Sequence, residues 1–265
     1  MKLNIDGRLA VISGAAGGIG LATARVLAED GARLFLTDAS EDALAEAAGT
    51  LGHSVVGSYA ADLTDDDAVA ALTERIGWKG GADILVHMAG ITGAKGDPLE
   101  MSNDDWFACW NTNFMSAVRM TRALVPGMVE KGWGRVVFTV SENAVQPYPD
   151  EAVYNASKAA LLSYTKALSL PYGPKGVLVN AVMPAFIESP MTDGMMDKRA
   201  EALGVSKDEA IKSFLDEERP YLSLKRRGQA DEVAAVAALL CSDRASFTNG
   251  SAWRADGGAV AAINT

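Results

Sequence analysis

The chain has 265 residues, which suits one large α/β domain, and 49% hydrophobic against 22% charged residues predict a packed core. A formal net charge of −10 argues against nucleic acid or an anionic membrane surface as the partner. The N-terminus turns polar too early for a signal peptide, and no apolar run approaches the roughly 18 residues of a transmembrane helix. Two cysteines are too few for a disulfide framework or a zinc site. We therefore expect a soluble cytoplasmic protein without a metal.

Apolar runs typical of strands alternate with helical patterns along almost the whole chain. The expected strands are residues 9–13, 33–37, 54–60, 83–87, 135–140, 177–182 and a last one near 251–255. Long helical patterns follow Ser102 and span residues 153–172. Val- and Leu-rich strands with crossover helices predict a Rossmann-like, doubly wound parallel sheet of about seven strands, with helices on both faces.

No change in composition marks a second domain, so we interpret residues 1–265 as a single domain. Residues 190–227 are its irregular part, polar and rich in methionine. We expect one or two helices there that cover a cleft, and we call residues 190–227 the lid segment.

A glycine-rich turn, Ser-Gly-Ala-Ala-Gly-Gly-Ile-Gly at residues 13–20, joins the first strand to a helical pattern over residues 21–30. Gly31 follows as a C-cap. Glycine allows a tight turn and a close backbone approach, and the helix N-terminus that follows favours a pyrophosphate. The alternative is a plain tight turn, but the position after the first strand favours dinucleotide binding.

Asp38 ends the second strand and indicates which dinucleotide binds. A carboxylate there accepts the ribose hydroxyls of an adenosine and repels a 2′-phosphate. No Lys or Arg lies within residues 14–20 or directly after Asp38. The predicted cofactor is therefore NAD rather than NADP. The alternative is a helix N-terminal charge ahead of Glu41.

Two other polar residues follow strands. Asp62 comes after the third strand, either near the adenine or beside a helix start formed by Thr64 and Asp67. His87 ends the fourth strand, where ligands bind in open α/β sheets. A hydrogen-bonded structural role is the more common one for a lone histidine at such a place.

The stretch around Tyr154 carries the pattern for proton transfer. Lys158 follows four residues later on the same helix face, so its ammonium is expected to lower the pKa of the phenol from about 10 towards neutrality. Such a phenol suits a general acid or base. Ser141, after the fifth strand, supplies a hydroxyl for a carbonyl or alkoxide oxygen. A second copy of the pattern, Tyr221 with Lys225, ends in a basic run typical of solvated surface.

Together these motifs resemble the classical short-chain dehydrogenase/reductase family over nearly the full length of the chain. The family's TGxxxGxG element is residues 13–20, its Asn-Asn-Ala-Gly element is residues 87–90, and its closing glycine-rich element is residues 248–258. The active-site residues of the family fall on Asn113, Ser141, Tyr154 and Lys158, with Asn111 as a rival for Asn113. The expected cofactor-binding residues are Gly14, Gly18, Ile19, Gly20, Asp38, Asp62, Leu63, Met88, Ala89, Gly90, Tyr154, Lys158, Pro184, Ile187 and Ser189.

The resemblance implies hydride transfer between nicotinamide and an alcohol or ketone. Tyr154 would exchange the hydroxyl proton, and Lys158 would lower its pKa and hold the nicotinamide ribose. Ser141 would bind the substrate oxygen, Asn113 would hold a water that links Lys158 to solvent, and Ser189 keeps the hydroxyl needed for the carboxamide. A homotetramer or homodimer is also implied. The apolar faces of residues 106–125 and 152–170 are then expected interfaces, with ordinary core as the alternative.

Two departures from the family pattern affect the expected site. His87 and Met88 replace two asparagines, so a side-chain hydrogen bond is lost or remade and Met88 would serve the cofactor only through its backbone. Ala185 replaces a glycine, which disfavours a positive φ and predicts a differently shaped turn.

An NAD-dependent secondary-alcohol dehydrogenase or ketone reductase is the leading interpretation. The nearest alternative, a 3-oxoacyl-carrier-protein reductase, docks an acidic carrier and typically uses NADPH, so Asp38 and the acidic chain argue against it. A Rossmann-type isomerase or lyase and a non-catalytic NAD-sensing module are further alternatives. The candidate substrate residues are Ser141, Glu142, Asn143, Tyr148, Phe186 and Met191, with Met195 and Met196. They favour a partly polar hydroxy compound, such as a cyclic polyol, a sugar or an aryl alcohol.

Overall fold

The computed structural model describes residues 2–263, apart from the side chain of Met191. Seven parallel strands form one sheet in the order β3-β2-β1-β4-β5-β6-β7. They are β1 (Leu9–Ser13), β2 (Arg33–Thr37), β3 (Val55–Ser58), β4 (Ile84–His87), β5 (Gly134–Thr139), β6 (Val177–Pro184) and β7 (Ala252–Ala255). The strand order reverses between β1 and β4, where ligands bind in such sheets. The predicted doubly wound sheet is confirmed.

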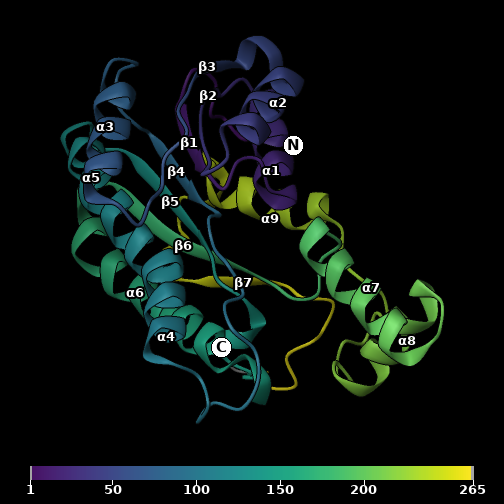
Figure 1. Cartoon of the computed structure of the whole chain (residues 1–265). Coiled ribbons are helices and arrows are strands. Elements are labelled where there is room, and N and C mark those ends of the chain that lie inside the picture. Colours follow the sequence, from purple (N-terminus) through teal and green to yellow (C-terminus); the bar gives the residue numbers. More distant parts are fainter. Residues whose placement is uncertain (1, 264–265) are drawn as a thin grey trace.

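Helices cover both faces of the sheet (Figure 1). One face carries α1 (Gly18–Glu29), α2 (Glu41–Leu51) and α9 (Ala230–Leu240). The other carries α3 (Asp66–Gly77), α5 (Ser116–Glu130) and α6 (Ala152–Tyr172), with α4 (Asn103–Trp110) beside α6. The lid segment forms two helices, α7 (Pro190–Leu203) and α8 (Lys207–Glu217), which extend from the sheet at the lower right of Figure 1.

Two hydrophobic cores lie on the two faces of the sheet. Along β1, Leu9 and Val11 belong to the core under α3, α5 and α6, while Ala10 and Ile12 belong to the core under α1 and α9. Successive strand side chains point to opposite faces, and both faces are covered, so the strand is apolar throughout. A third, smaller cluster joins the lid segment to the residues after β6 and β7: Phe186, Met196, Phe214, Leu215, Leu222 and Ala259.

Side-chain caps explain where several helices begin. Ser102 accepts a hydrogen bond from the backbone of Asp105, whose side chain accepts from the backbone of Ser102, so the predicted helix start is confirmed. The helix is interrupted by one π-helical turn, Asn111–Met115, before α5. The predicted start at Thr64 is wrong by one residue, because the Asp65 carboxylate accepts from the N–H groups of Asp67 and Ala68.

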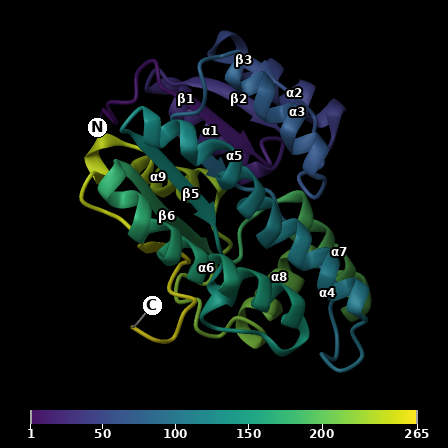
Figure 2. The same cartoon turned by 90° about the vertical axis from the view of Figure 1, so that its left-hand side faces the viewer.

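The helices α4, α5 and α6 share the face that Figure 2 turns towards the viewer. Met120 and Leu161 on this face are fully buried, as ordinary core would be. Phe107 on α4 and Leu170 on α6 are instead mostly exposed. The interface between copies of the chain therefore stays a prediction, with these two side chains as its apolar part. Among residues 2–263, no helix is long and apolar enough to span a bilayer.

The turn between β1 and α1 needs glycine at two positions. Gly14 has a φ of +65°, and a Cβ there would lie 2.8 Å from the backbone nitrogen of Ala89. A Cβ on Gly20 would lie 2.1 Å from the carbonyl oxygen of Gly14. Both contacts are with backbone, so no side-chain movement relieves them. The glycines therefore allow α1 to begin directly against the turn.

Gly20→Ala is expected to lower the free energy of unfolding by at least about 2 kcal/mol, because the backbone must shift to admit the methyl group. Gly49→Ala in α2 is the matched control, since nothing lies within 4 Å of an added Cβ there. This control should be neutral or raise the free energy of unfolding by up to about 1 kcal/mol through helix propensity. Urea unfolding of both variants checks this, and equal effects would contradict it.

Candidate active site

The four predicted catalytic residues come together at the carboxyl edge of β4 and β5. Lys158 Nζ lies 5.6 Å from the centre of the Tyr154 ring and donates to the carbonyl oxygen of Thr139 at 2.7 Å. A Cβ on Gly90 would lie 3.1 Å from Asn113 Oδ1 and 3.5 Å from Lys158 Nζ. Three segments therefore converge there: the loop after β4, the π-helical turn before α5, and α6.

The structure raises the pKa of the Tyr154 phenol instead of lowering it. Desolvation by burial is the largest cause, and the nearby Glu142 carboxyl adds to it, while the Ser141 hydroxyl acts in the opposite direction. Lys158 points to the carbonyl of Thr139 and lies over the ring face rather than at the hydroxyl. The predicted lowering of the Tyr154 pKa by Lys158 is therefore wrong. Tyr154 is a neutral phenol at physiological pH.

Lys158 is itself buried, and burial lowers its pKa to about 8. An ammonium with this pKa is mostly protonated at neutral pH, but less firmly than an exposed lysine. The second copy of the pattern gives a clear contrast. Tyr221 and Lys225 lie in the turns after α8, and Tyr221 is exposed, as predicted for solvated surface.

Asn113 is fully buried in the π-helical turn, and its amide has partners on both sides. Its Oδ1 accepts from the backbone N–H of Ile91 at 2.7 Å, and its Nδ2 donates to the Ile91 carbonyl and to Ser157 Oγ at 2.9 Å each. The side chain thus ties the loop after β4 to α6. Asn111, the rival position, is only partly buried and accepts from Arg119. The predicted role of Asn113 in holding a water stays a prediction. Because its side-chain amide already has protein partners, the backbone of Asn113 would have to bind that water.

Ser141 begins a buried polar network. Its hydroxyl donates to Glu142 Oε2 at 2.6 Å, has Asn143 Oδ1 at 3.0 Å, and accepts from the backbone N–H of Asn143 at 3.3 Å. Asn143 Nδ2 then donates to Glu151 Oε2 at 2.6 Å and to Asn155 Oδ1 at 2.8 Å. Ser141, Glu142 and Asn143 are each less than 5% exposed. The wall beside Ser141 is therefore polar and enclosed.

Charged residues from three other segments complete this network. Arg219, after α8, lies 3.4 Å from Glu151 Oε1 and 3.9 Å from Glu142 Oε1, and its guanidinium stacks 3.4 Å from the centre of the Tyr148 ring. Lys95, in the loop after β4, donates to Glu151 at 2.6 Å. Arg219, Glu151 and Lys95 have no place in the predicted site. Their positions in three distant segments follow only from the fold.

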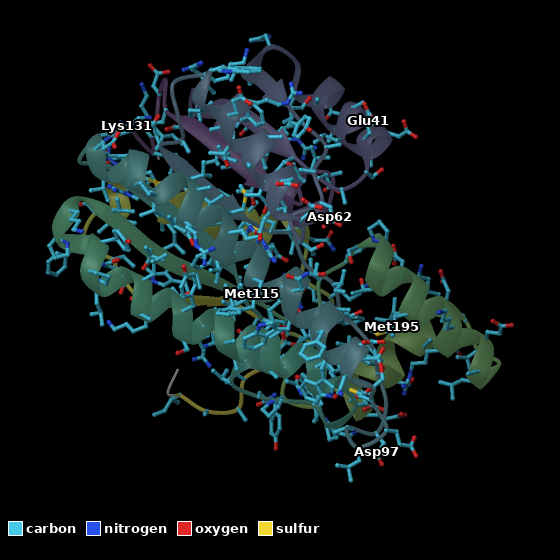
Figure 3. The ribbon with its side chains drawn as sticks, turned by 60° about the vertical axis from the view of Figure 1, so that its left-hand side comes forward. Glu41, Asp62, Asp97, Met115, Lys131 and Met195 are labelled. Carbon is cyan, nitrogen blue, oxygen red and sulfur yellow. The ribbon has the colours of Figure 1, made fainter. Side chains whose placement is uncertain are left out.

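The remaining candidate substrate residues lie around the lid segment. Phe186 is buried with its ring centre 4.7 Å from that of Phe214, so it fills the third cluster. Lys95 Nζ lies 3.7 Å from the sulfur of Met195, which Figure 3 labels on α7. Met196 is fully buried as core filler. Met191 lies outside the described side chains, and the substrate contacts of these residues stay predictions.

The glycine-rich turn forms a cradle at the N-terminus of α1. This helix begins without a side-chain cap and without an acidic residue in its first turn, unlike α2, α3, α4 and α8. Its first N–H groups therefore have neither a capping side chain nor a nearby negative charge, as an anion site requires. Asp38 lies beside this turn and accepts from the N–H of Ala16 at 3.0 Å. These residues fit a dinucleotide phosphate with its adenosine ribose at Asp38.

Three comparisons with known proteins agree. A family model described as Enoyl-(Acyl carrier protein) reductase matches residues 14–260. The chain belongs to the short-chain dehydrogenase/reductase family. The uncharacterized oxidoreductase YvrD of Bacillus subtilis is 31% identical over 264 residues, covering 99% of this chain and 100% of that protein. The 3-oxoacyl-[acyl-carrier-protein] reductase FabG of Thermotoga maritima is 33% identical, covering 97% and 100%. The crystal structure of L-sorbose reductase from Gluconobacter frateurii, complexed with NADPH and L-sorbose, superposes with a TM-score of 0.93 at 35% identity, covering 99% and 100%.

The other predicted cofactor residues of this dehydrogenase/reductase lie along the same edge. Asp62, labelled in Figure 3, is exposed after β3, and its carboxylate accepts from Thr64, which lowers its pKa. Leu63 is buried in the core, so only its backbone reaches the edge. Ile19 lies in the first turn of α1, Met88, Ala89 and Gly90 follow β4, and Pro184 ends β6. Their contacts with a cofactor stay predictions.

The differently shaped turn after β6 stays a prediction. Ala185 has no positive φ, and Ile187 pairs with Gly228 in a short parallel bridge. Ser189 caps α7 by accepting from the N–H of Thr192, whose hydroxyl donates to the Ile187 carbonyl at 2.7 Å. Thr192 is a residue that sequence reasoning missed, although the spacing Ser-x-x-Thr is a signal for a capped helix start.

His87 is hydrogen-bonded through both of its ring nitrogens. Its Nδ1 lies 2.9 Å from Ser13 Oγ and its Nε2 lies 3.0 Å from Ser116 Oγ, which links β1 to α5. Burial lowers its pKa to about 3, with a smaller contribution from Lys158. The structural alternative for His87 is confirmed. Among the described residues, no group of three or more His, Cys, Asp or Glu side chains is arranged to hold a metal.

His87→Asn is expected to make stability less sensitive to acid. Because folding lowers the pKa of His87 from 6.5 to about 3, the unfolded chain binds the extra proton first, and stability is lost as the pH falls below 6.5. Between pH 6.5 and about pH 5 the wild type should lose about 2 kcal/mol through this group, and the variant should not. Urea unfolding at both pH values measures it. The control is His53→Asn, at the exposed second histidine, and a wild-type pH dependence in His87→Asn would contradict the argument.

Proposed function

We propose that the protein is an NAD(H)-dependent oxidoreductase that interconverts a secondary alcohol and a ketone, with Tyr154 as the general acid and base. One observation carries this proposal. Ser141, Tyr154, Lys158 and Asn113 lie together at the carboxyl edge of the sheet, next to the glycine cradle at α1. This combination supports a substrate oxygen bound between Ser141 and Tyr154.

The protonation states favour reduction of a ketone. Tyr154 is neutral because its pKa is raised, so it holds a proton that it can donate to a developing alkoxide. Lys158 lies 5.6 Å from the centre of the ring and is mostly protonated, so its ammonium would donate to the nicotinamide ribose and hold the cofactor beside Tyr154. The hydroxyl of Ser141 binds the substrate oxygen. Together the three side chains would bind the substrate oxygen and move one proton.

The nicotinamide cofactor, when bound, supplies or accepts the hydride. Gly14 and Gly20 let α1 begin directly against the turn, so its first N–H groups would hold the pyrophosphate, and Asp38 would accept the hydroxyls of the adenosine ribose. A 2′-phosphate would place a second negative charge against the Asp38 carboxylate. This supports NAD, although the similar L-sorbose reductase is described as complexed with NADPH.

We propose a polyhydroxylated ketone, such as a ketose, as the substrate class. The wall beside Ser141 is built from the polar side chains of Glu142, Asn143 and Glu151, which favours a substrate that carries hydroxyl groups over an apolar one. The lid segment brings Arg219 to this wall and would cover the substrate. The similarity to L-sorbose reductase supports the same class.

A 3-oxoacyl-carrier-protein reductase is the second candidate function. The similarity to FabG and the description of the matching family model favour it. The formal net charge of −10 and the charged wall argue for a small polar substrate instead of an acidic carrier with an acyl chain. Turnover of acetoacetyl-CoA but not of ketoses would select this second candidate.

Tyr154→Phe is expected to lower kcat for ketose reduction by about 10²- to 10⁴-fold, because the phenylalanine carries no proton to donate. NADH binding, followed by the fluorescence of the bound cofactor, should change less than about twofold. Tyr221→Phe is the matched control in the second copy of the pattern and should keep full activity. Full activity in Tyr154→Phe would overturn the proposal, and so would tight NADH binding without turnover of any ketone by the wild type.

Asp38 is expected to make NADH bind about 10- to 100-fold more tightly than NADPH. The 2′-phosphate of NADPH replaces a ribose hydroxyl, so a hydrogen bond to the charged carboxylate is lost. Asp38→Ala should reduce this preference towards unity, because it weakens the binding of NADH and removes the repulsion between the carboxylate and the 2′-phosphate of NADPH. Asp42→Ala, which removes an exposed carboxylate from the first turn of α2, is the control and should keep the preference. Titration calorimetry measures both constants. Tighter binding of NADPH by the wild type would reject the NAD assignment.

A further inference from the structure

The Ser141 hydroxyl has one hydrogen and two acceptor positions. In the structure the hydrogen points to Glu142 Oε2 at 2.6 Å, with Asn143 Oδ1 at 3.0 Å as the other acceptor. The backbone N–H of Asn143 occupies one acceptor position at 3.3 Å. Either the hydrogen or the second acceptor lone pair of the hydroxyl is therefore left for a substrate oxygen. The neighbouring carboxyl decides which of the two it is.

An ionised Glu142 can only accept, so it takes the hydrogen of Ser141. The serine then offers only its second lone pair, which cannot bind a carbonyl oxygen. It does not serve a reacting alcohol either, because the single hydroxyl hydrogen of the alcohol is the one that Tyr154 takes. A protonated Glu142 can instead donate to this lone pair. The serine then turns its hydrogen away from the carboxyl and donates it to a carbonyl oxygen. Reduction of a ketone and oxidation of an alcohol pass through the same transition state, in which Ser141 donates to the reacting oxygen, so both need the protonated form of Glu142.

We propose that Glu142 is a positioning residue whose protonation sets the direction of the Ser141 O–H bond: the protonated form frees this hydrogen for the substrate oxygen in both directions, and the ionised form withholds it. This inference rests on the proposed function, because it assumes that Ser141 binds the substrate oxygen. The reaction itself is unchanged. A ketone takes one hydride, which the nicotinamide cofactor would supply, and one proton from Tyr154, and the reverse reaction returns each to its source. Glu142 transfers nothing to the substrate.

The surroundings of Glu142 allow both states near neutral pH. Four groups from other elements face it: Arg219 after α8, Glu151 before α6, Tyr148 in the loop before Glu151, and Tyr154 on α6. Arg219 favours the ionised form, but from 3.9 Å, and it is shared with Glu151 at 3.4 Å. Burial favours the neutral form and is the larger effect, so the pKa of Glu142 is raised to about 7.

The arrangement of Asn143 fits this role. Its Nδ2 donates to Glu151 and to Asn155, which fixes the orientation of the amide and turns Oδ1 towards Ser141. When Glu142 is protonated, Asn143 Oδ1 is the acceptor that holds the serine hydrogen before a carbonyl arrives. Ser141 therefore has two defined orientations rather than free rotation.

The test compares the pH profiles of wild type, Glu142→Gln and Glu130→Gln in both directions. L-sorbose with NADH or NADPH is the probe for reduction, and D-sorbitol with the oxidised cofactor is the probe for oxidation. In the wild type, kcat/KM for reduction should fall about tenfold per pH unit above the pKa of Glu142, and kcat/KM for oxidation should rise to a plateau. Glutamine both donates and accepts at every pH, so Glu142→Gln should lose the fall in reduction near neutral pH. Its kcat/KM for oxidation should keep rising with pH without the plateau, because Tyr154 must still lose its proton to accept that of the alcohol.

Glu130→Gln, the same change at an exposed residue at the end of α5, should keep the wild-type profile. Arg219→Gln removes the cation that favours the ionised carboxylate, so it should move the fall in reduction and the plateau in oxidation to higher pH. This second variant keeps the test decisive where Glu142→Gln folds poorly. Unchanged profiles in either Glu142→Gln or Arg219→Gln would overturn the inference and leave the proposed function standing. A wild type that turns over no ketone would overturn both.

A readout without turnover uses Tyr154→Phe, in which Ser141 is the remaining hydroxyl donor to the substrate oxygen. Infrared difference spectra of bound hydroxyacetone, labelled with ¹³C at its carbonyl, report the strength of the hydrogen bond to that oxygen. The carbonyl band should lie at lower frequency at about pH 6 than at about pH 8.5. The double variant with Glu142→Gln should show one frequency at both pH values. A shift with pH in the double variant, or none in Tyr154→Phe, would overturn the proposal.

Discussion

Burial of ionisable side chains at the carboxyl edge of β4 and β5 is the constraint on which the site depends. Loss of hydration is the largest effect on Tyr154, Lys158 and Glu142 alike, and it favours the neutral form of each. Such groups are tolerated only with hydrogen-bond partners. Within the described part of the chain, no buried side-chain nitrogen or oxygen lacks one. The fold therefore supplies a closed set of polar contacts, and the same contacts determine the protonation states.

The partners come from the two layers of the fold and from the lid segment. The strand β5 positions the carbonyl that holds Lys158, and the π-helical turn positions Asn113 against the loop after β4. The lid segment adds Arg219, whose guanidinium contacts both Glu142 and Glu151. A movement of α7 and α8 would thus change the charge beside Ser141 as well as the shape of the substrate wall. Substrate binding and protonation are therefore coupled through one arginine in the proposed mechanism.

The elements and the four central site residues could be predicted because their signals are local. Residues 9–13 and 33–37 are continuous apolar runs that match β1 and β2 residue for residue, and the glycine turn follows directly. Tyr154 and Lys158 need only one helix. Glu151, Lys95 and Arg219 meet from three segments far apart in the chain, so no spacing indicated them. The pKa of Tyr154 was predicted in the wrong direction because a sequence shows a neighbouring lysine but not the extent of desolvation.

His87 and Glu142 show how the same burial leads to different chemistry. Burial favours the neutral form of both, but His87 meets two serine hydroxyls that satisfy a neutral ring, so its pKa falls to about 3 and it stays neutral at any working pH. Glu142 lies beside Arg219 and Glu151, whose opposite charges partly cancel in their effect on it, and burial raises its pKa to about 7. The first residue is therefore fixed as a structural link. The second can exchange a proton within the working range, which is why the direction of the Ser141 hydroxyl depends on Glu142 and not on His87.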